Sequence, residues 1–270
     1  MALSRLGKLV SVVSCVIYAS GATAHEFWIE AETYQVPSGG QIVANLKNGQ
    51  NLQGTTLSYL PRNFTRFDLI DGDEVIAVEG RLGDRPALNM PGPDDGLIVA
   101  VHETTPAYVN YTEWEKFAAF AAHKDFADIA ARHAANGFPD APFKERYTRH
   151  AKALIAVGDG AGADREVGLK TEFVALSNPY EPGFDNVMRV QVLLRGAPRP
   201  DAQVEVFDRS GEGDVQVTLH RTDANGIAAI PVTPGHDYLF DAVVLEPIAG
   251  DETAVWDTYW AALTFDVPAP

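Results

Sequence analysis

The chain has 270 residues, of which 46% are hydrophobic and 21% charged, a composition typical of one large or two ordinary globular domains rather than a disordered or collagen-like chain. Asp and Glu number 37 against 21 Lys and Arg, and the net charge of −16 makes DNA and RNA poor partners. The single cysteine excludes an internal disulfide, Cys-rich zinc sites and iron–sulfur clusters, so any metal site needs histidine, carboxylate or backbone ligands.

Residues 1–24 have the three-part pattern of a secretory signal peptide. Two basic residues precede an apolar run over residues 9–19, and small residues end the segment. We therefore predict cleavage after Ala24 and a periplasmic or secreted protein. The apolar run is too short to span a bilayer, and no later stretch approaches the ~20 apolar residues that a spanning helix needs. The protein is not expected to span a membrane.

Lipidation at Cys15 is an alternative fate of the leader, because residues 12–15 loosely resemble a lipoprotein cleavage box. The apolar run continues past this cysteine, which favours ordinary cleavage. Cleavage after Ala24 would leave 246 residues with no cysteine and a net charge of −18, because the leader holds two basic and no acidic residues. Such a chain fits a bacterial periplasm better than a disulfide-linked extracellular module.

Residues 25–112 are predicted to form a first β-sandwich domain. Short apolar or alternating runs are separated by turn signals such as Asn48-Gly49 and Asp71-Gly72. The run from Leu97 to Val101 is continuously apolar, which is typical of a buried strand.

Residues 113–157 are predicted to form a helical insert. Thr112 and Glu115 have the spacing of a capping box, and apolar residues follow at helical intervals to about Ala135. A second helix is expected after Pro142, where proline is tolerated in a first turn. Its apolar face would hold Tyr147, Ala151, Leu154 and Ile155.

Residues 158–166 are rich in Gly, Ala and Asp and are predicted to be a linker, followed by a second β-sandwich domain over residues 167–270. Short strands recur there at a spacing of roughly 8–12 residues, and residues 222–226 mark a tight turn. The predicted fold is mainly β, with two β-sandwich domains of immunoglobulin or transthyretin type and a short two-helix insert between them.

His25 is the strongest candidate metal ligand. After cleavage it would be the first residue, and its α-amine and imidazole together could chelate nickel, cobalt, copper or zinc. The alternative interpretation is a frayed end beside a strand that begins with Phe27, Trp28 and Ile29.

His102 and His236 are the other candidate ligands. His102 shares a face with Ile98 and Ala100, so a histidine at the edge of the core with a satisfied hydrogen bond is the favoured interpretation, and a second metal ligand is the alternative. His236 lies next to Asp237 in a turn, and the pair could contribute to a peripheral metal site.

The remaining histidines and aromatic residues are interpreted as structural. His123 and His133 lie about 80° apart on the predicted helix, cannot hold one ion together and are assigned to a solvated face. His150 is assigned to packing. Trp256, Tyr259 and Trp260 could form a sugar-stacking platform, but a buried interface is the favoured interpretation.

The sequence contains no nucleophile elbow, no Walker loop, no His-Glu-x-x-His motif and no cysteine nucleophile in the mature chain. We therefore predict that the protein is not an enzyme. A copper redox enzyme built on His25 is the alternative.

Four segments in this order carry a family resemblance, over nearly the whole mature length. They are residues 25–30 directly after Ala24, residues 145–152, residues 222–226 and residues 256–265. The chain resembles a family of exported bacterial proteins of unassigned function that are commonly labelled periplasmic components of nickel or cobalt uptake systems. The resemblance implies two β-sandwich domains, the second transthyretin-like, and the handling of a divalent transition metal.

Two positions depart from the family pattern. Relatives carry a histidine near the end of the strand that here runs from Asp241 to Glu246, and this chain has none near Val244. Relatives also carry tyrosine where this chain has His150.

The leading hypothesis is a periplasmic, non-enzymatic protein that binds or relays nickel or cobalt, with His25 as the anchor ligand and His102 as the second. Its partner would be a membrane metal transporter. The alternative from another class is a carbohydrate-binding or adhesion module, in which His25 has no role.

Overall fold

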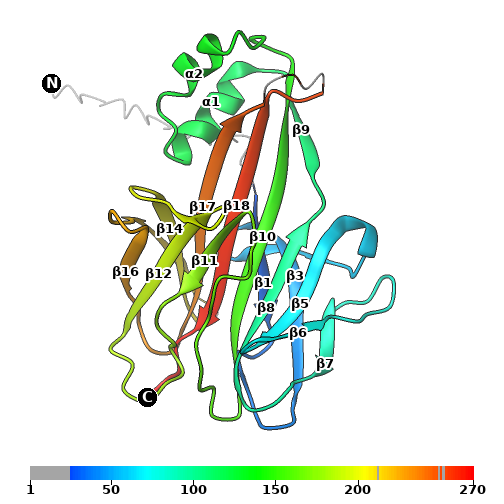
Figure 1. Cartoon of the computed structure of the whole chain (residues 1–270), viewed down its shortest axis with the longest axis vertical. Helices are drawn as coiled ribbons and strands as arrows, with labels where there is room; N and C mark the ends of the chain where they lie inside the picture. Colours follow the sequence, from blue (N-terminus) through cyan, green and yellow to red (C-terminus); the bar gives the residue numbers. More distant parts are fainter. Residues whose placement is uncertain (1–24, 212, 249, 251–252) are drawn as a thin grey trace, which may run out of the picture.

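The computed structural model describes residues 25–270 except positions 212, 249, 251 and 252. The chain is mainly β, as predicted, and is built around one large sheet (Figure 1). The predicted leader, its cleavage after Ala24 and the alternative lipidation of Cys15 lie outside the described residues. In the part of the chain that is described, no helix has the length and apolar character needed to cross a membrane.

The large sheet has ten strands. Eight of them follow one another across the sheet in the order β15 (Val215–Arg221), β14 (Gln203–Ser210), β17 (His236–Pro247), β18 (Trp256–Asp266), β10 (Phe143–Val157), β8 (Gly96–Thr104), β5 (Phe64–Asp71) and β6 (Glu74–Ala77). The strands β2 (Gln35–Val36) and β9 (Ala107–Tyr111) also pair with β10. The central strand β10 pairs with β18 in parallel and with β8 antiparallel, so one sheet contains strands from both predicted domains.

Two four-stranded sheets cover the large sheet. The first consists of β1 (Glu26–Ala31), β3 (Gln41–Gln50), β4 (Gln53–Leu57) and β7 (Leu88–Pro91), and the second of β11 (Thr171–Ala175), β12 (Val187–Leu194), β13 (Ala197–Pro198) and β16 (Ile227–Pro231). Alternate residues of β8 belong to different cores: Ile98 and Ala100 pack with the first small sheet, and Val99 and Val101 with the second. The two small sheets therefore lie on opposite faces of the large one.

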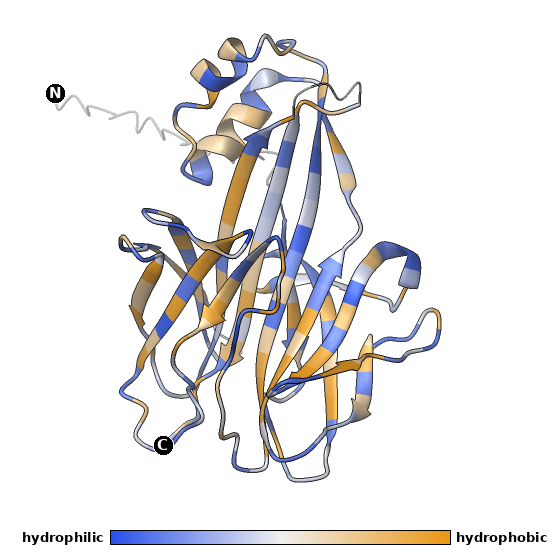
Figure 2. Ribbon diagram, viewed as in Figure 1, coloured by the Kyte–Doolittle hydropathy of each residue, from blue (hydrophilic) through white to orange (hydrophobic). Residues whose placement is uncertain are grey.

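Burial on both faces explains the apolar run that predicts β8. Residues 97–101 are all buried, because odd and even positions each face a covering sheet. In β12, which is covered on one face, buried and more exposed positions largely alternate. Figure 2 shows this alternation as banding along β12.

Two helices, α1 (Trp114–His123) and α2 (Ile129–Ala135), lie over one end of the large sheet (Figure 1). Phe117 and Phe120 pack there against Trp256 and Trp260. The prediction of a single helix to Ala135 is wrong, because the chain turns between the two helices at Asp125, which has a φ of 72°. The predicted capping box is absent as well, since the N-cap is Glu113 and makes no side-chain cap bond.

The prediction of a second helix after Pro142 is wrong. Residues 143–157 form β10, the central strand of the large sheet, so the helical insert ends before Phe143. From Ala151 to Val157 every residue is buried, because small sheets cover both faces. A buried run that is apolar except for Lys152 has no clear period, and helical spacing can be found in it by chance.

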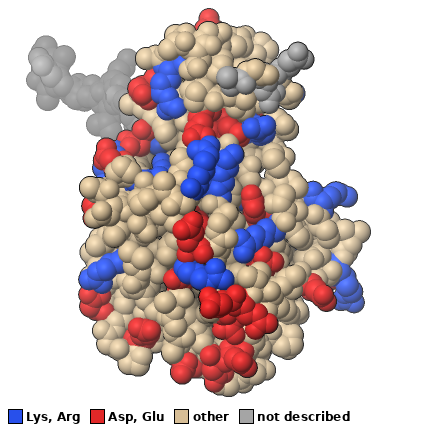
Figure 3. Space-filling view, viewed as in Figure 1, with Lys and Arg blue, Asp and Glu red and all other residues tan. Residues whose placement is uncertain are grey.

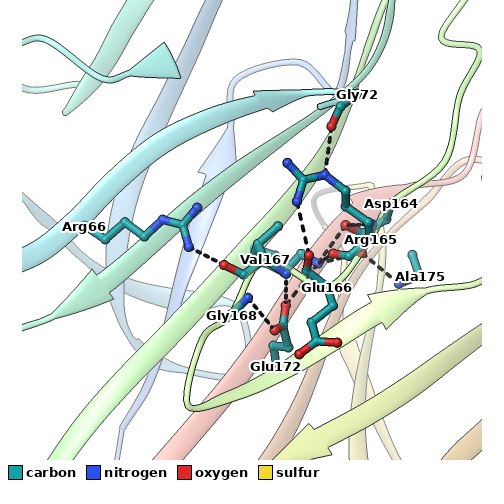
Figure 4. A network of polar contacts seen from close by, with 10 residues as sticks. Arg66, Gly72, Asp164, Arg165, Glu166, Val167, Gly168, Glu172 and Ala175 are labelled. Atoms are coloured by element: carbon teal, nitrogen blue, oxygen red, sulfur yellow. Dashed lines mark hydrogen bonds and ion pairs between the residues drawn. The ribbon is translucent and has the colours of Figure 1, made fainter. Parts of the chain in front are cut away.

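The segment between β10 and β11, which includes the predicted linker, has no regular structure but is held firmly (Figure 4). Lys152 donates to Asp164 at 2.7 Å, and the carboxylate of Glu172 accepts the backbone N–H of Val167 at 3.0 Å. Arg66 from β5 donates to the carbonyl of Val167 at 2.7 Å. These bonds attach the segment to both β5 and β11.

Candidate functional site

His25 lies directly before β1 and is exposed. Its carbonyl accepts a hydrogen bond from Nη2 of Arg149 at 2.8 Å, and the next residue, Glu26, is already in register with β3. Its side chain lines a polar hollow of about 690 Å³ together with Asn48 and Asp214, the His25 hollow. This anchoring argues against a frayed end.

His102 lies in β8 and is buried on the face that packs against the first small sheet, as the favoured interpretation predicts. Its ring centroid lies 5.1 Å from that of Phe27, 5.3 Å from Phe64 and 5.0 Å from Phe67. Burial lowers the pKa of His102 to about 3, so the ring is neutral at physiological pH. The predicted hydrogen bond is absent, because neither ring nitrogen has a partner among the described residues.

His25 and His102 line different hollows. His102 lines a separate pocket of about 420 Å³, which shares Asn48 and Thr55 with the His25 hollow. His236 begins β17, and its Nδ1 lies 2.6 Å from Oδ1 of Asp208 rather than beside another histidine. Across residues 25–270, apart from the four positions outside the description, no three His, Cys, Asp or Glu side chains are grouped to hold a metal ion.

A buried lysine that pairs with Glu26, the residue after His25, is the feature that sequence reasoning missed. Nζ of Lys124 lies 2.6 Å from Oε2 of Glu205, 2.9 Å from Oδ2 of Asp241 and 3.4 Å from Oε1 of Glu26. The ammonium group also lies 4.8 Å from the ring centroid of Trp260. We call these four charged residues, Glu26, Lys124, Glu205 and Asp241, the Lys124 cluster. A protein cation already occupies the space between its carboxylates.

The Lys124 cluster holds more negative than positive charge. Burial alone would lower the pKa of Lys124, but the three carboxylates outweigh it and keep the ammonium group charged. Burial, and then the charge of Asp241, raises the pKa of Glu26 to about 7. The pKa of Glu205 is lowered despite its burial, because His123 and Lys124 bond to it. The cluster therefore exchanges a proton near neutral pH.

A signal for this cluster was present in the sequence. Glu205 and Asp241 are single acids within the apolar runs of β14 and β17, and Glu26 directly precedes a run of three large apolar residues. An isolated charge in a buried strand requires a partner of opposite charge. The identity of that partner, Lys124 at the end of α1, depends on how the helices lie on the sheet and could not be read from the pattern.

The other histidines have structural partners. His123 is exposed, as predicted, and its Nε2 lies 3.1 Å from Oε1 of Glu205. The assignment of His133 to a solvated face is wrong: it is buried, with Nδ1 3.0 Å from the indole nitrogen of Trp256 and Nε2 2.8 Å from the carbonyl of Pro139. The reason is that α2 packs its C-terminal turn onto the sheet.

The remaining structural interpretations are confirmed. His150 is buried, with Nδ1 3.0 Å from the carbonyl of Trp260. Trp256, Tyr259 and Trp260 are also buried, so they form no exposed platform for sugar stacking. In the turn at residues 222–226, the Asp223 carboxylate accepts backbone N–H groups of the turn.

The family described as Domain of unknown function (DUF4198) matches residues 22–246. No curated protein matches the sequence. Among solved structures, the chain is similar to the D0-D1 domain of Intimin, with 12% identity, coverage of 88% of this chain and 97% of that chain, and a TM-score of 0.23. It is also similar to a tetra-tandem repeat in the extending region of a large adhesion protein, with 11% identity, coverage of 90% and 50%, and a TM-score of 0.21.

Proposed function

We propose that this chain, which belongs to the DUF4198 family, is an exported, non-enzymatic protein that binds a divalent transition metal ion at its mature N-terminus. The α-amine and imidazole of His25 would supply two nitrogen donors, and Asp214 in the same hollow would supply a carboxylate. This donor set suits nickel or cobalt, the metals that the sequence resemblance implies, and also copper or zinc.

The observation that carries the proposal is the anchoring of His25. The carbonyl group is bonded to Arg149, and β1 begins at the next residue. A chelating residue that is already ordered loses less conformational entropy on binding an ion than a mobile one does. His102 lies in the neighbouring pocket and is not among the donors we propose.

The charge of the protein favours this function. A mature chain with a net charge of −18 attracts cations over a Debye length of ~10 Å. Figure 3 shows acidic side chains gathered at the lower end of one face. In our proposal a membrane metal transporter receives the ion, and the half of the chain that carries the second small sheet is the scaffold or docking surface.

Calorimetric titration tests the proposal. The chain beginning at His25 is titrated with Ni²⁺, Co²⁺, Cu²⁺ and Zn²⁺, and the titration is repeated on a form whose α-amine is acetylated. We expect acetylation to weaken binding at least about tenfold, because it removes the α-amine from the chelate ring. His220→Ala is the matched control, since this histidine lines neither hollow.

Each outcome decides between hypotheses. Equal affinity with a free and an acetylated α-amine would show that the N-terminal chelate is wrong. No affinity for any of the four metals would favour the carbohydrate-binding or adhesion module instead. Oxygen consumption by the copper-loaded protein with a reductant would support the redox enzyme and contradict a non-enzymatic role.

A further inference from the structure

The pocket around His102 lies where the first small sheet and the large sheet separate. It is lined by β1, β3 and β4 on one side and by β5, β8, β9 and β10 on the other, with the short 3-10 helix η1 (Pro61–Asn63) at its margin. Its volume of about 420 Å³ is within the range of ~300–1,000 Å³ that is usual for small-molecule sites. We call it the His102 pocket.

The buried part of the lining of the His102 pocket is apolar except for one group. Phe27 and Leu46 are buried there, Leu57 and Phe64 are half-buried, and His102 is the buried polar residue. His102 is 2% exposed, and both of its ring nitrogens lack a partner among the described residues. A buried imidazole without hydrogen bonds is costly, by roughly 1–3 kcal/mol, and therefore requires an explanation.

The rim of the pocket is basic, although the protein is acidic. Arg85 and Arg149 both line it, and none of the described lining residues is Asp or Glu. Arg85 is oriented by a hydrogen bond from its Nε to the hydroxyl of Ser58 at 2.6 Å. Nη2 of Arg149 donates to the carbonyl of His25, whereas its Nε is buried and has no partner among the described residues. The carboxylates whose charges act on Arg149, namely Glu26, Glu145 and Asp241, do not line the pocket, so both lining charges are positive in a chain with a net charge of −16.

We propose that the His102 pocket binds a small organic anion with an apolar body and a hydroxyl group at its far end, such as a hydroxyarylalkyl or terminally hydroxylated medium-chain carboxylate. The carboxylate would lie at the rim on Arg85 and Arg149, and the apolar body would lie against Phe27 and Phe64. His102 would exchange one hydrogen bond with the hydroxyl group at the inner end. This site differs from the proposed metal site, because neither His25 nor Asp214 lines it.

The neutral state of His102 fits this arrangement. A charged imidazole would be expelled from the aromatic surroundings, whereas a neutral ring offers one N–H donor and one nitrogen acceptor. The binding charge therefore comes from the arginines alone. The arginines should recognise the carboxylate by its charge. The shape of the pocket and one polar contact with His102 should recognise the rest of the ligand.

The test uses 4-hydroxyphenylacetate and 8-hydroxyoctanoate as probes. The chain from His25 onward is examined by saturation-transfer NMR and calorimetry, with 4-hydroxyphenylacetamide and 8-hydroxyoctanamide as neutral counterparts of the same shape. We expect one ligand per chain and an affinity for the acids at least about tenfold higher than for the amides. Arg85→Met should reduce the affinity for the acids at least about tenfold and leave that for the amides unchanged.

Arg81→Met is the matched control, because Arg81 lies in the same loop, its side chain is 93% exposed and it does not line the pocket. A second variant, His102→Phe, keeps an aromatic ring of similar size and should weaken both acids and amides. The proposal is wrong if neither acid binds at about 1 mM, an affinity of about −4 kcal/mol, if acids and amides bind equally, or if Arg85→Met and Arg81→Met behave alike. Nickel or copper titration of Arg85→Met should match the unmodified chain, which separates this proposal from the metal site.

Discussion

Lys124 and Lys152, the two lysines that are buried among the described residues, have contrasting surroundings on opposite faces of the large sheet. Lys152 has Asp164 at 2.7 Å and Glu172 at 3.7 Å, and both carboxylates also accept backbone N–H groups. Lys124 has three carboxylates around one ammonium group. The first arrangement attaches a long connecting segment and supports its carboxylates with backbone donors. The second leaves excess negative charge around Lys124, which pairs with Glu26, the residue after the proposed metal ligand.

Among the changes considered, replacement of each lysine by methionine should lower the free energy of unfolding most. Lys124→Met leaves three buried carboxylates without a cation, and we expect the free energy of unfolding to fall by roughly 3–5 kcal/mol at pH 8. Lys152→Met should cost less, about 2 kcal/mol, because backbone donors still stabilise Asp164 and Glu172. Urea denaturation followed by tryptophan fluorescence measures both.

The pH dependence of these two variants sharpens the comparison. At pH 5 the three carboxylates that have lost their cation in Lys124→Met can take up protons, so the loss of stability in this variant should shrink. The loss in Lys152→Met should change less. An equal loss in both variants at both pH values would show that the two clusters are equivalent, in contradiction to the structural contrast.

Glu26 should make the folded protein less stable as the pH rises. Its pKa is about 7 in the folded state against a usual value of 4.5, so the folded state binds the proton more tightly than the unfolded chain does. This contribution to stability is complete below about pH 4.5 and is lost as the pH rises to about 7. Glu26→Gln should therefore raise the free energy of unfolding by about 1–3 kcal/mol at pH 8 and leave it nearly unchanged at about pH 4.5.

The control for Glu26→Gln is Glu115→Gln, which removes an exposed carboxylate from the first turn of α1. It should have little effect at either pH. A loss of stability in Glu26→Gln at pH 8 would mean that the ion pair with Lys124 outweighs the burial of the carboxylate.

The fold class could be predicted from the sequence because turn signals and apolar runs are local. The run at residues 97–101 correctly predicts a buried strand. β10 could not be recognised in the same way, since its apolar run is covered on both faces by sheets that are distant in the sequence. Its identity as a strand depends on parallel pairing with β18, which lies far along the chain.

The site residues could be predicted where their own position in the sequence determines their surroundings. The face of His102 follows from strand alternation, and the candidacy of His25 follows from the predicted cleavage site. The partners of Lys124 come from β1, β14 and β17, and only the packed structure brings them together. The same holds for His133, whose burial depends on Trp256 from the last strand.

The smallest expected effect on stability concerns two buried histidines that differ in their hydrogen bonds. His133 has a partner at each ring nitrogen, whereas His102 has none among the described residues. His102→Phe should therefore raise the free energy of unfolding by about 1 kcal/mol, because it removes two unsatisfied polar atoms from an aromatic environment. His133→Phe should lower it by about 1–3 kcal/mol, because the indole N–H of Trp256 and the carbonyl of Pro139 would lose their partner. Urea denaturation at pH 7.5 compares the two variants. A similar loss of unfolding free energy in both would mean that the His102 ring has hydrogen-bond partners in solution. Its nitrogens would then not be available to bind a ligand.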